Sequence, residues 1–203
     1  MRLDLIPRAI ATSSPAVALL GLALLPIGAG TTLAAEAPPA AAALVVMPGD
    51  LPVALRERDG RHLVLQRRLR RLLVLEDGMV AHHFPVAVGM PGWETPAGSF
   101  EVLEMRQQPV WEHPENGQLT PAGPQNPLGS RWIGFHQDCD GRQGWDGERV
   151  LDVKGCVVMG FHGTPHRWTV GRAVSHGCVR LYDEHVQELF DLVEVGTSVT
   201  VLE

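Results

Sequence analysis

Short apolar segments separated by glycine and proline make up most of the sequence beyond residue 60, and they restrict the chain to a mainly β fold. The 203 residues include 22 glycines and 16 prolines, which favour turns and interrupt helices. Between the turns, apolar runs predict strands at residues 62–66, 72–75, 79–88, 100–105, 131–135, 157–161 and 198–202. A set of short strands like this predicts a β-sandwich or small barrel.

One segment near the C-terminus has a different period. Apolar residues recur at helical spacing over residues 186–193, which predicts one helix in this half of the chain. Asp183 is the expected N-cap, and Gly196 is expected to end the helix. Because the helix begins five residues after Cys178, we expect it to pack on the sheet and hold the loop that carries this cysteine.

The first 37 residues are typical of an export signal. Arg2 and Arg8 precede an apolar run at residues 16–27, which is shorter than the ~20 residues of a membrane-spanning helix. Small residues at positions 35 and 37 fit a cleavage site, although an uncleaved anchor stays open. We therefore expect a signal peptide or anchor and the start of a linker at residues 1–37. An Ala/Pro-rich linker and lead-in segment should follow at 38–60, and one domain at 61–203. The expected location is the periplasm or cell envelope.

Charge argues against a nucleic-acid partner. The formal net charge is -6, and the only basic cluster lies at residues 67–71 between two apolar runs. That position predicts the solvated end of a hairpin, and contact with an anionic cell-wall polymer is an alternative. We expect a monomer.

The three cysteines are Cys139, Cys156 and Cys178. In an oxidising compartment an odd number leaves at least one thiol unpaired. We predict that Cys139 and Cys156 form a disulfide and that Cys178 is free. Three reduced cysteines are the alternative, because spacing alone does not establish connectivity.

The segment around the third cysteine has the composition of a nucleophile loop. Residues 175–180 read SHGCVR, and His162 lies upstream in the segment FHGT. A thiol needs a base to become the reactive thiolate, and His162 and His176 are both candidates. A buried structural cysteine is the alternative. A zinc site at His162, His166, His176 and Cys178 does not fit the usual ligand spacings, so we expect no metal and no cofactor.

Four segments in order carry a family resemblance. They are TPAGSF at residues 95–100, NPLG at 126–129 leading into RWIGF at 131–135, HGT at 162–164 and SHGCVRL at 175–181. Together they resemble the L,D-transpeptidase catalytic domain, also called the YkuD domain, over roughly residues 63–202. The stretch at 136–156 matches no part of the family pattern. We expect this insertion to border the active-site groove and to limit the choice of acceptor.

The resemblance implies a role for each residue of the site. Cys178 would be the nucleophile and His162 the general base, oriented by the backbone carbonyl of Gly163 or Thr164. His176 would shape the pocket or act as the second candidate base.

The remaining loop residues would support the nucleophile. The N–H groups of Gly177 and Cys178 would bind the oxyanion, and Ser175 would bond the loop backbone. Arg180 would hold the loop, with a substrate carboxylate as the alternative partner.

The implied reaction is acyl transfer on peptidoglycan stem peptides, which would be both donor and acceptor. Cys178 would form an acyl-thioester with a tetrapeptide stem and release D-Ala. The amine of a second stem would then give a 3→3 cross-link. A lysine of an envelope lipoprotein, or water as in an L,D-carboxypeptidase, are alternative acceptors. A non-catalytic peptidoglycan-binding module and a zinc-dependent hydrolase are the other classes of function. An intact Cys178 and His162 argue against the first, and the ligand spacing argues against the second.

Overall fold

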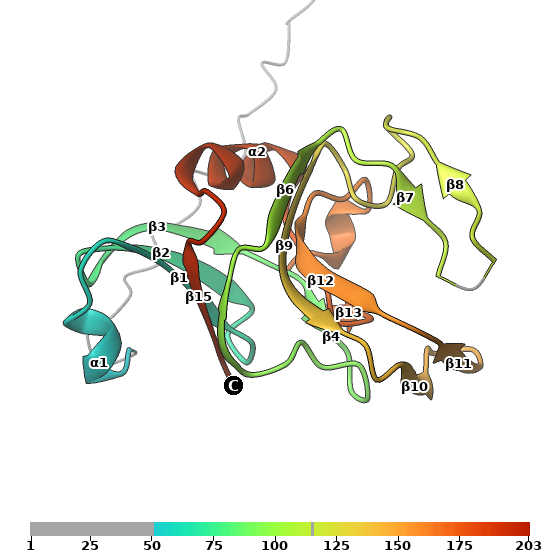
Figure 1. The fold of residues 1–203 in the computed structure, drawn as a ribbon, viewed down its shortest axis with the longest axis horizontal. Helices are drawn as coiled ribbons and strands as arrows, with labels where there is room; N and C mark the ends of the chain where they lie inside the picture. The colour runs from blue at the N-terminus through green and yellow to red at the C-terminus, as the bar shows by residue number, and fades with distance from the viewer. Residues whose placement is uncertain (1–50, 115) are drawn as a thin grey trace, which may run out of the picture. The chain divides into compact units, whose positions relative to one another are not determined.

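Two β-sheets form the scaffold of the protein (Figure 1). The computed structural model describes residues 51–114 and 116–203, so the expected signal peptide at 1–37 lies outside the described residues. The larger sheet has five strands. In spatial order they are β3 (Met79–Pro85), β2 (Arg71–Glu76), β1 (Arg61–Gln66), β15 (Ser198–Leu202) and β5 (Gly98–Glu101). Within this larger sheet only β1 and β15 run parallel, and their pairing joins the first and last strands of the domain.

The second sheet carries the candidate site. Its four strands, in spatial order, are β14 (Val179–Arg180), β12 (Val157–His162), β9 (Arg131–Asp138) and β6 (Glu104–Gln107). Strand β14 pairs parallel to β12, with Phe161 opposite Val179 and His162 opposite Arg180. The other pairings in this sheet are antiparallel.

Three short two-stranded pairs complete the strand set. They are β4 (Val88–Gly89) with β13 (Ala173–Ser175), β7 (Trp111–Glu112) with β8 (Leu119–Thr120), and β10 (Arg142–Trp145) with β11 (Val150–Val153). The last pair lies inside the insertion at residues 136–156. This insertion is therefore an ordered hairpin in the structure.

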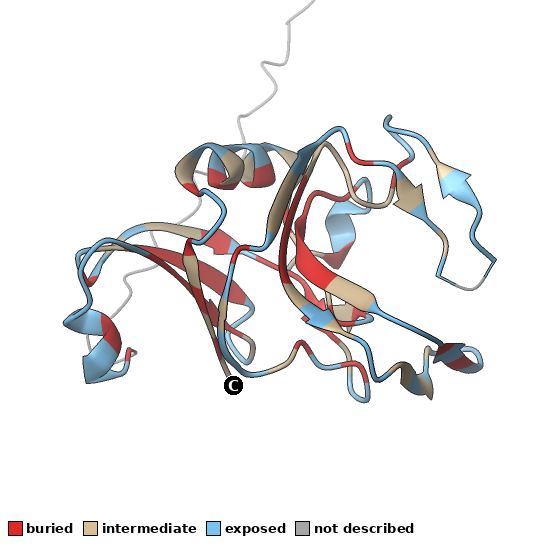
Figure 2. Ribbon diagram, in the orientation of Figure 1, coloured by how far each residue is buried: buried red, intermediate tan, exposed pale blue. Residues whose placement is uncertain are grey.

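One apolar core joins the two sheets to the helix α2 (Asp183–Leu192). It contains Leu63 and Leu65 from β1, Phe135 from β9, Phe161 from β12 and Leu189 from α2, all at most 1% exposed. Figure 2 shows buried segments on the strands of both sheets and on part of the helix. The mainly β fold with one helix after the cysteine loop, predicted from the apolar pattern, is confirmed.

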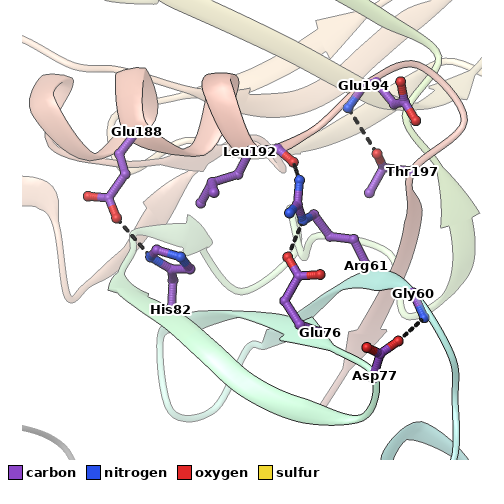
Figure 3. A network of polar contacts seen from close by, with 9 residues as sticks. All are labelled: Gly60, Arg61, Glu76, Asp77, His82, Glu188, Leu192, Glu194 and Thr197. Atoms are coloured by element: carbon purple, nitrogen blue, oxygen red, sulfur yellow. Dashed lines mark hydrogen bonds and ion pairs between the residues drawn. The ribbon is translucent and has the colours of Figure 1, made fainter.

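Polar contacts also fasten α2 to the larger sheet (Figure 3). Arg61 of β1 pairs with Glu76 of β2 and donates a hydrogen bond to the Leu192 carbonyl at the last residue of the helix. His82 of β3 lies 2.9 Å from a carboxylate oxygen of Glu188. The helix that follows the cysteine loop is thus held at two points along its length.

Two shorter helices lie outside this core. Helix α1 (Val53–Arg56) buries Leu55, which packs with Leu51 in a second apolar cluster on the larger sheet. The end of the predicted linker at 38–60 therefore contacts the folded domain. A 3-10 helix, η2 (Arg167–Thr169), lies between β12 and β13. No helix within residues 51–114 and 116–203 is long and apolar enough to cross a membrane.

The predicted strand at residues 100–105 is wrong as a single element. The chain crosses from one sheet to the other at Val102, whose N–H donates to Thr197, whereas the Leu103 N–H donates to Gly134. Strand β5 therefore pairs with β15, and β6 pairs with β9. Two adjacent apolar residues at 102 and 103 break the alternation, which is the local signal of this crossing.

The predicted helix ends also need correction. Tyr182, with extended backbone angles, occupies the N-cap, so Asp183 is the first helical residue. The Asp183 carboxylate instead accepts a hydrogen bond from the Ser130 N–H at 2.7 Å and another from Gln187. The helix ends at Leu192, before the turn that contains Gly196. The Asp183 carboxylate, which was predicted to cap the helix, therefore bonds the loop before β9 instead.

Candidate active site

Cys178 lies in the short loop between β13 and β14, which carries residues 176–178. It is partly exposed, and it is the free cysteine of the described chain because Cys139 and Cys156 form a disulfide. Neighbouring residues of a strand point to opposite faces, so Val179 and Arg180 of β14 point to opposite sides of the sheet. Val179 and its partner Phe161 are both 0% exposed, which identifies the side of Val179 as the core.

His162 is on the same face as Arg180. The two residues are register partners on β12 and β14. His162 and Arg180 therefore lie on the side of the sheet that faces away from the core, and the Arg180 charge acts on both His162 and Cys178, which directly precedes β14. The sequence places the candidate nucleophile and the candidate base on separate segments, and the parallel pairing of β14 with β12 brings these segments together.

The His162 ring is buried and held in one orientation. Its Nδ1 lies 2.6 Å from the Gly163 carbonyl, which confirms the predicted backbone partner. In the neutral ring Nδ1 then carries the hydrogen, and Nε2 keeps a lone pair for use as a base. Burial, together with the charge of Arg180, lowers the pKa of His162 to about 4. The ring is therefore neutral at physiological pH.

The thiol of Cys178 is also neutral at rest. Burial raises its pKa above the ordinary thiol value, and three weaker effects oppose this rise: a hydrogen bond from the Gly160 backbone and the charges of Arg180 and Arg142. A neutral thiol beside a neutral imidazole is suited to proton transfer during attack rather than to a preformed thiolate–imidazolium pair.

His176 has a different environment. Its side chain is exposed, and its ring meets the edge of the Trp93 ring at a centroid distance of 4.9 Å. Burial of part of the ring and the charge of Arg180 lower its pKa, whereas Asp146 raises it. Its position at the surface beside Trp93 suits a residue that shapes the pocket.

All four carbonyl groups of residues 175–178 accept hydrogen bonds. The donors are Met90 N–H to Ser175 (2.9 Å), Arg142 Nη1 to His176 (3.2 Å), Thr95 Oγ1 to Gly177 (2.8 Å) and Ser175 Oγ to Cys178. The N–H of Gly177 donates to Ser175 Oγ at 3.3 Å, whereas the N–H of Cys178 has no acceptor among the described residues. The Cys178 amide is thus the donor that is free to meet an oxyanion.

Arg180 supports the loop through its backbone. Its N–H and carbonyl pair with Ala87 at 3.0 and 2.8 Å. Within residues 51–114 and 116–203 its guanidinium makes no hydrogen bond to the cysteine loop; the side-chain donors from outside the loop are Arg142 and Thr95. The Arg180 charge instead acts on the ionisation of both Cys178 and His162.

Close packing holds the segment after His162. A Cβ atom added at Gly163 would lie 2.2 Å from Asp183 Oδ1 and 3.2 Å from the Cα of Gly129, so any side chain there would have to displace the Asp183 carboxylate from its hydrogen bond with Ser130. Thr164 is buried, and its hydroxyl accepts a hydrogen bond from the His166 N–H at 3.1 Å. The carbonyl that orients His162 is thereby fixed by the loop before β9 and by the first residue of α2.

Two residues of the site were missed from the sequence alone. Thr95 belongs to the TPAGSF segment that was recognised, but its contact with Gly177 spans 82 positions. Arg142 lies in the stretch at residues 136–156, which contains none of the four recognised motifs, and its contact with His176 spans 34 positions. No local pattern pointed to either contact.

A pocket of about 410 Å³ lies beside this site. It is lined by Gln108, Gly123, Pro124, Asn126, Gly129, Ser130, Thr164, Pro165 and Asp183. It adjoins Thr164, two residues after His162, and does not include Cys178. Among the described residues no group of three or more His, Cys, Asp or Glu side chains is arranged to hold a metal ion.

Sequence comparison matches this chain to known proteins over the same region. The family described as YkuD, L,D-transpeptidase catalytic domain, matches residues 60–201. A Bacillus subtilis (strain 168) protein named as a candidate L,D-transpeptidase, YqjB, is 32% identical over 140 residues, which are 69% of this chain and 70% of YqjB. ErfK/SrfK of Escherichia coli K12, likewise named as a candidate, is 30% identical over 140 residues, which are 63% of this chain but only 39% of that protein.

Solved structures share the fold. The structure described as the Ldtfm–avibactam carbamoyl enzyme has a TM-score of 0.53 and 20% identity, over 72% of this chain and 50% of that one. The structure of LdtMt1 in complex with imipenem has a TM-score of 0.50 and 23% identity, over 71% of this chain and 59% of that one.

Proposed function

Because the chain belongs to the YkuD L,D-transpeptidase catalytic domain family, a family of cell-wall enzymes, we propose that it is a cysteine L,D-transpeptidase acting on peptidoglycan tetrapeptide stems. One observation carries the proposal. His162 and Arg180 are partners on one face of the β14–β12 pair directly after Cys178, and the Nδ1 of His162 is committed to Gly163, which leaves Nε2 for the thiol proton. We further propose export to the periplasm or cell envelope.

In the first half-reaction the sulfur attacks the carbonyl of the diamino acid at position three of a stem. The bond between Sγ and that carbon forms as His162 Nε2 takes the thiol proton. The tetrahedral oxyanion then collapses, and the bond to D-Ala breaks. D-Ala leaves with the proton from His162, and an acyl-thioester stays on Cys178.

In the second half-reaction an amine replaces the sulfur. The side-chain amine of another stem attacks the thioester, and His162 takes the amine proton and returns it to the sulfur. The product is a 3→3 cross-link and the thiol is restored. A lysine amine of an envelope lipoprotein would give protein anchoring by the same steps. Water would give the hydrolysis of an L,D-carboxypeptidase.

The loop backbone supplies stabilisation of the oxyanion. The unpaired N–H of Cys178 is the main donor, and Gly177 can add its own N–H if the long 3.3 Å bond to Ser175 Oγ yields. The carbonyls on either side are held by other groups, so they do not turn toward the developing negative charge.

Arg180 would bind a carboxylate of the donor stem. Its guanidinium is next to the reacting pair and makes no hydrogen bond to the loop within the described residues. A guanidinium matches a carboxylate with two parallel hydrogen bonds. We therefore place substrate binding before loop support for this side chain.

The direct test is intact-protein mass spectrometry after exposure to imipenem, the compound bound in the related LdtMt1 structure. The β-lactam should add its full mass to the wild-type protein once, by ring opening on the thiol. Cys178→Ala should give no adduct with an unchanged circular dichroism spectrum. An adduct that persists in Cys178→Ala, or no adduct on folded wild-type protein, would contradict the nucleophile assignment.

Incubation with purified disaccharide tetrapeptides then identifies the acceptor. Release of D-Ala together with a tetrapeptide–tripeptide dimer supports the transpeptidase. Release of D-Ala without a dimer supports the carboxypeptidase, and no release of D-Ala supports a binding module.

A further inference from the structure

The insertion at residues 136–156 ends in a hairpin that reaches the cysteine loop. A disulfide between Cys139 and Cys156 closes its base, and β10 begins at Arg142. Figure 1 shows β10 and β11 beyond the ends of β9 and β12. Nothing in the proposed reaction assigns a role to this element.

Arg142 joins two segments of the site. Its Nη1 donates to the His176 carbonyl at 3.2 Å, and its Nη2 donates to the Glu94 carbonyl at 3.1 Å. Its guanidinium also lies 5.5 Å from the centroid of the Trp93 ring. The planar guanidinium can serve both carbonyls at once because its nitrogens are held in a rigid fork.

The contact bears on the residue just before the nucleophile. Gly177 has a φ of +116°, and a Cβ added there would lie 2.5 Å from Arg142 Nη1. Glycine provides this close approach, but it also leaves the backbone free to adopt many conformations. The peptide planes on either side of Gly177 therefore need bonds from outside the loop.

Each of these planes is held by one donor. A carbonyl and the following N–H belong to one planar trans peptide and point in opposite directions. Arg142, by binding the His176 carbonyl, holds the plane that contains the Gly177 N–H from outside the loop, whereas within the loop this N–H has only the long 3.3 Å bond to Ser175 Oγ. Thr95, by binding the Gly177 carbonyl, fixes the plane that contains the Cys178 N–H.

The hairpin itself is docked so that Arg142 is presented in one place. Trp93, 1% exposed, donates its ring N–H to the Trp145 carbonyl at 3.1 Å and packs with Leu151 and Val153 of β11. A Cβ added at Gly144 would lie 2.7 Å from the Trp93 ring nitrogen, so the β10 backbone rests directly on the indole.

We propose that Arg142 is a positioning residue for the Cys178 nucleophile, and that the disulfide-closed hairpin exists to hold it on the His176 and Glu94 carbonyls. This inference rests on the proposed function. Arg142 acts through the loop backbone and touches no reacting atom. Its charge is a second contribution, because with Arg180 it favours the thiolate of Cys178.

Two substitutions separate the geometric from the electrostatic contribution. Arg142→Lys keeps the charge but offers one nitrogen, so it can hold only one carbonyl firmly. Arg142→Gln removes the charge. Lys154→Gln is the matched control, since it removes an exposed positive charge from the same hairpin.

Two measurements are made on each full-length variant with its disulfide formed. The first is the rate of imipenem acylation against concentration, which separates the maximal rate from binding. The second is the pH dependence of Cys178 alkylation by iodoacetamide, with melting temperature as the folding control. One reactive thiol under denaturing, non-reducing conditions verifies the disulfide.

We expect Arg142→Gln to lower the maximal acylation rate by about 10²-fold, the cost of a small misplacement at a reacting centre, with little change in imipenem binding. Its alkylation midpoint should move to higher pH, because a nearby positive charge that favours the thiolate is lost. Arg142→Lys should lower the rate by about 10-fold with an unchanged midpoint. Lys154→Gln should behave as wild type.

The disulfide is tested through a double-mutant cycle. Cys139→Ala/Cys156→Ala should slow acylation in the wild-type background but add little in the Arg142→Gln background, because both changes release the same guanidinium. Equal slowing in both backgrounds would show that the disulfide does not act through Arg142.

The outcomes separate this inference from the proposed function. If wild type acylates at Cys178 and both Arg142 variants, folded, acylate at its rate, then Arg142 has no positioning role while the proposed function stands. The same holds if Lys154→Gln slows acylation as much as Arg142→Gln. If folded wild type forms no adduct, the proposed function fails first.

Discussion

Thr95→Val removes one hydroxyl group on which two buried backbone groups depend. Thr95 is 0% exposed; its Oγ1 donates to the Gly177 carbonyl at 2.8 Å and accepts from the Gly89 N–H at 3.2 Å. Valine has nearly the shape of threonine, so the packing volume is retained. The substitution leaves a buried carbonyl and a buried N–H without partners.

The free-energy cost follows from these two groups. A buried polar group left without a partner costs about 1–3 kcal/mol, so Thr95→Val should lower the free energy of unfolding by roughly 2–6 kcal/mol. Thr95→Ser keeps the hydroxyl and deletes one methyl group, which costs about 1 kcal/mol. The serine variant is therefore the matched control.

The same change should slow the chemistry. Once the Gly177 carbonyl is released, the peptide that carries the Cys178 N–H can rotate, and the oxyanion donor is no longer aimed. Loss of one such donor costs about 10²–10³-fold in rate. We expect the maximal rate of imipenem acylation to fall by this factor in Thr95→Val, and by less than about 10-fold in Thr95→Ser.

Urea unfolding followed by tryptophan fluorescence gives the stability, and timed mass spectrometry gives the acylation rate below the melting temperature. An equal urea midpoint for wild type and Thr95→Val would refute the energetic reasoning. A folded Thr95→Val that acylates as fast as Thr95→Ser would refute the link from this hydroxyl to the nucleophile loop.

Four further outcomes test the site. Because burial and Arg180 hold the pKa of His162 at about 4, below its ordinary 6.5, acylation should stay nearly constant down to about pH 5, whereas a loss centred near pH 6.5 would contradict a neutral base. The free energy of unfolding should fall as pH drops from 6.5 toward 4, because His162 has the higher pKa in the unfolded chain and takes up its proton there first. His162→Ala should slow acylation by about 10²–10⁴-fold and more than His176→Ala does, and the reverse order in folded variants would exchange their roles. Replacing residues 138–154 by a short glycine linker removes Arg142, so acylation should fall along with acceptor transfer; a change in acceptor preference alone would support the expectation from the sequence instead.

The first two strands and the last strand of the domain were predictable because their apolar residues are either nearly continuous or strictly alternating. Residues 62–66, 72–75 and 198–202 were predicted as strands, and the structure has β1, β2 and β15 there. Their side chains are buried on both faces or alternate strictly, and either pattern identifies a strand. The error at residues 100–105 came from treating two adjacent apolar residues as one continuous run, although the shift in alternation marked the crossing between sheets.

The sequence was enough to propose Cys178 as nucleophile and His162 as base, but not to find the groups that hold them. The Gly163 carbonyl is adjacent to His162, so the resemblance was enough to predict that contact. Arg142 reaches Glu94 across 48 positions, and its hairpin lies in a stretch that contains none of the four recognised motifs. Long-range hydrogen bonds to backbone carbonyls leave no periodicity and require no particular neighbour in sequence, so only the fold reveals them.

The two supports of Gly177 differ in how firmly the fold holds them, and this difference has a consequence for activity. Thr95 is buried in the body of the domain, so its bond to the loop should persist whenever the domain is folded. Arg142 belongs to a peripheral hairpin, and such elements open locally at a lower free energy than global unfolding. The disulfide opposes this opening because it restricts the chain in the open state. If Arg142 acts as proposed, the rate of acylation depends on the local stability of the hairpin. A domain with an intact core and a released hairpin would then melt almost normally and still react slowly.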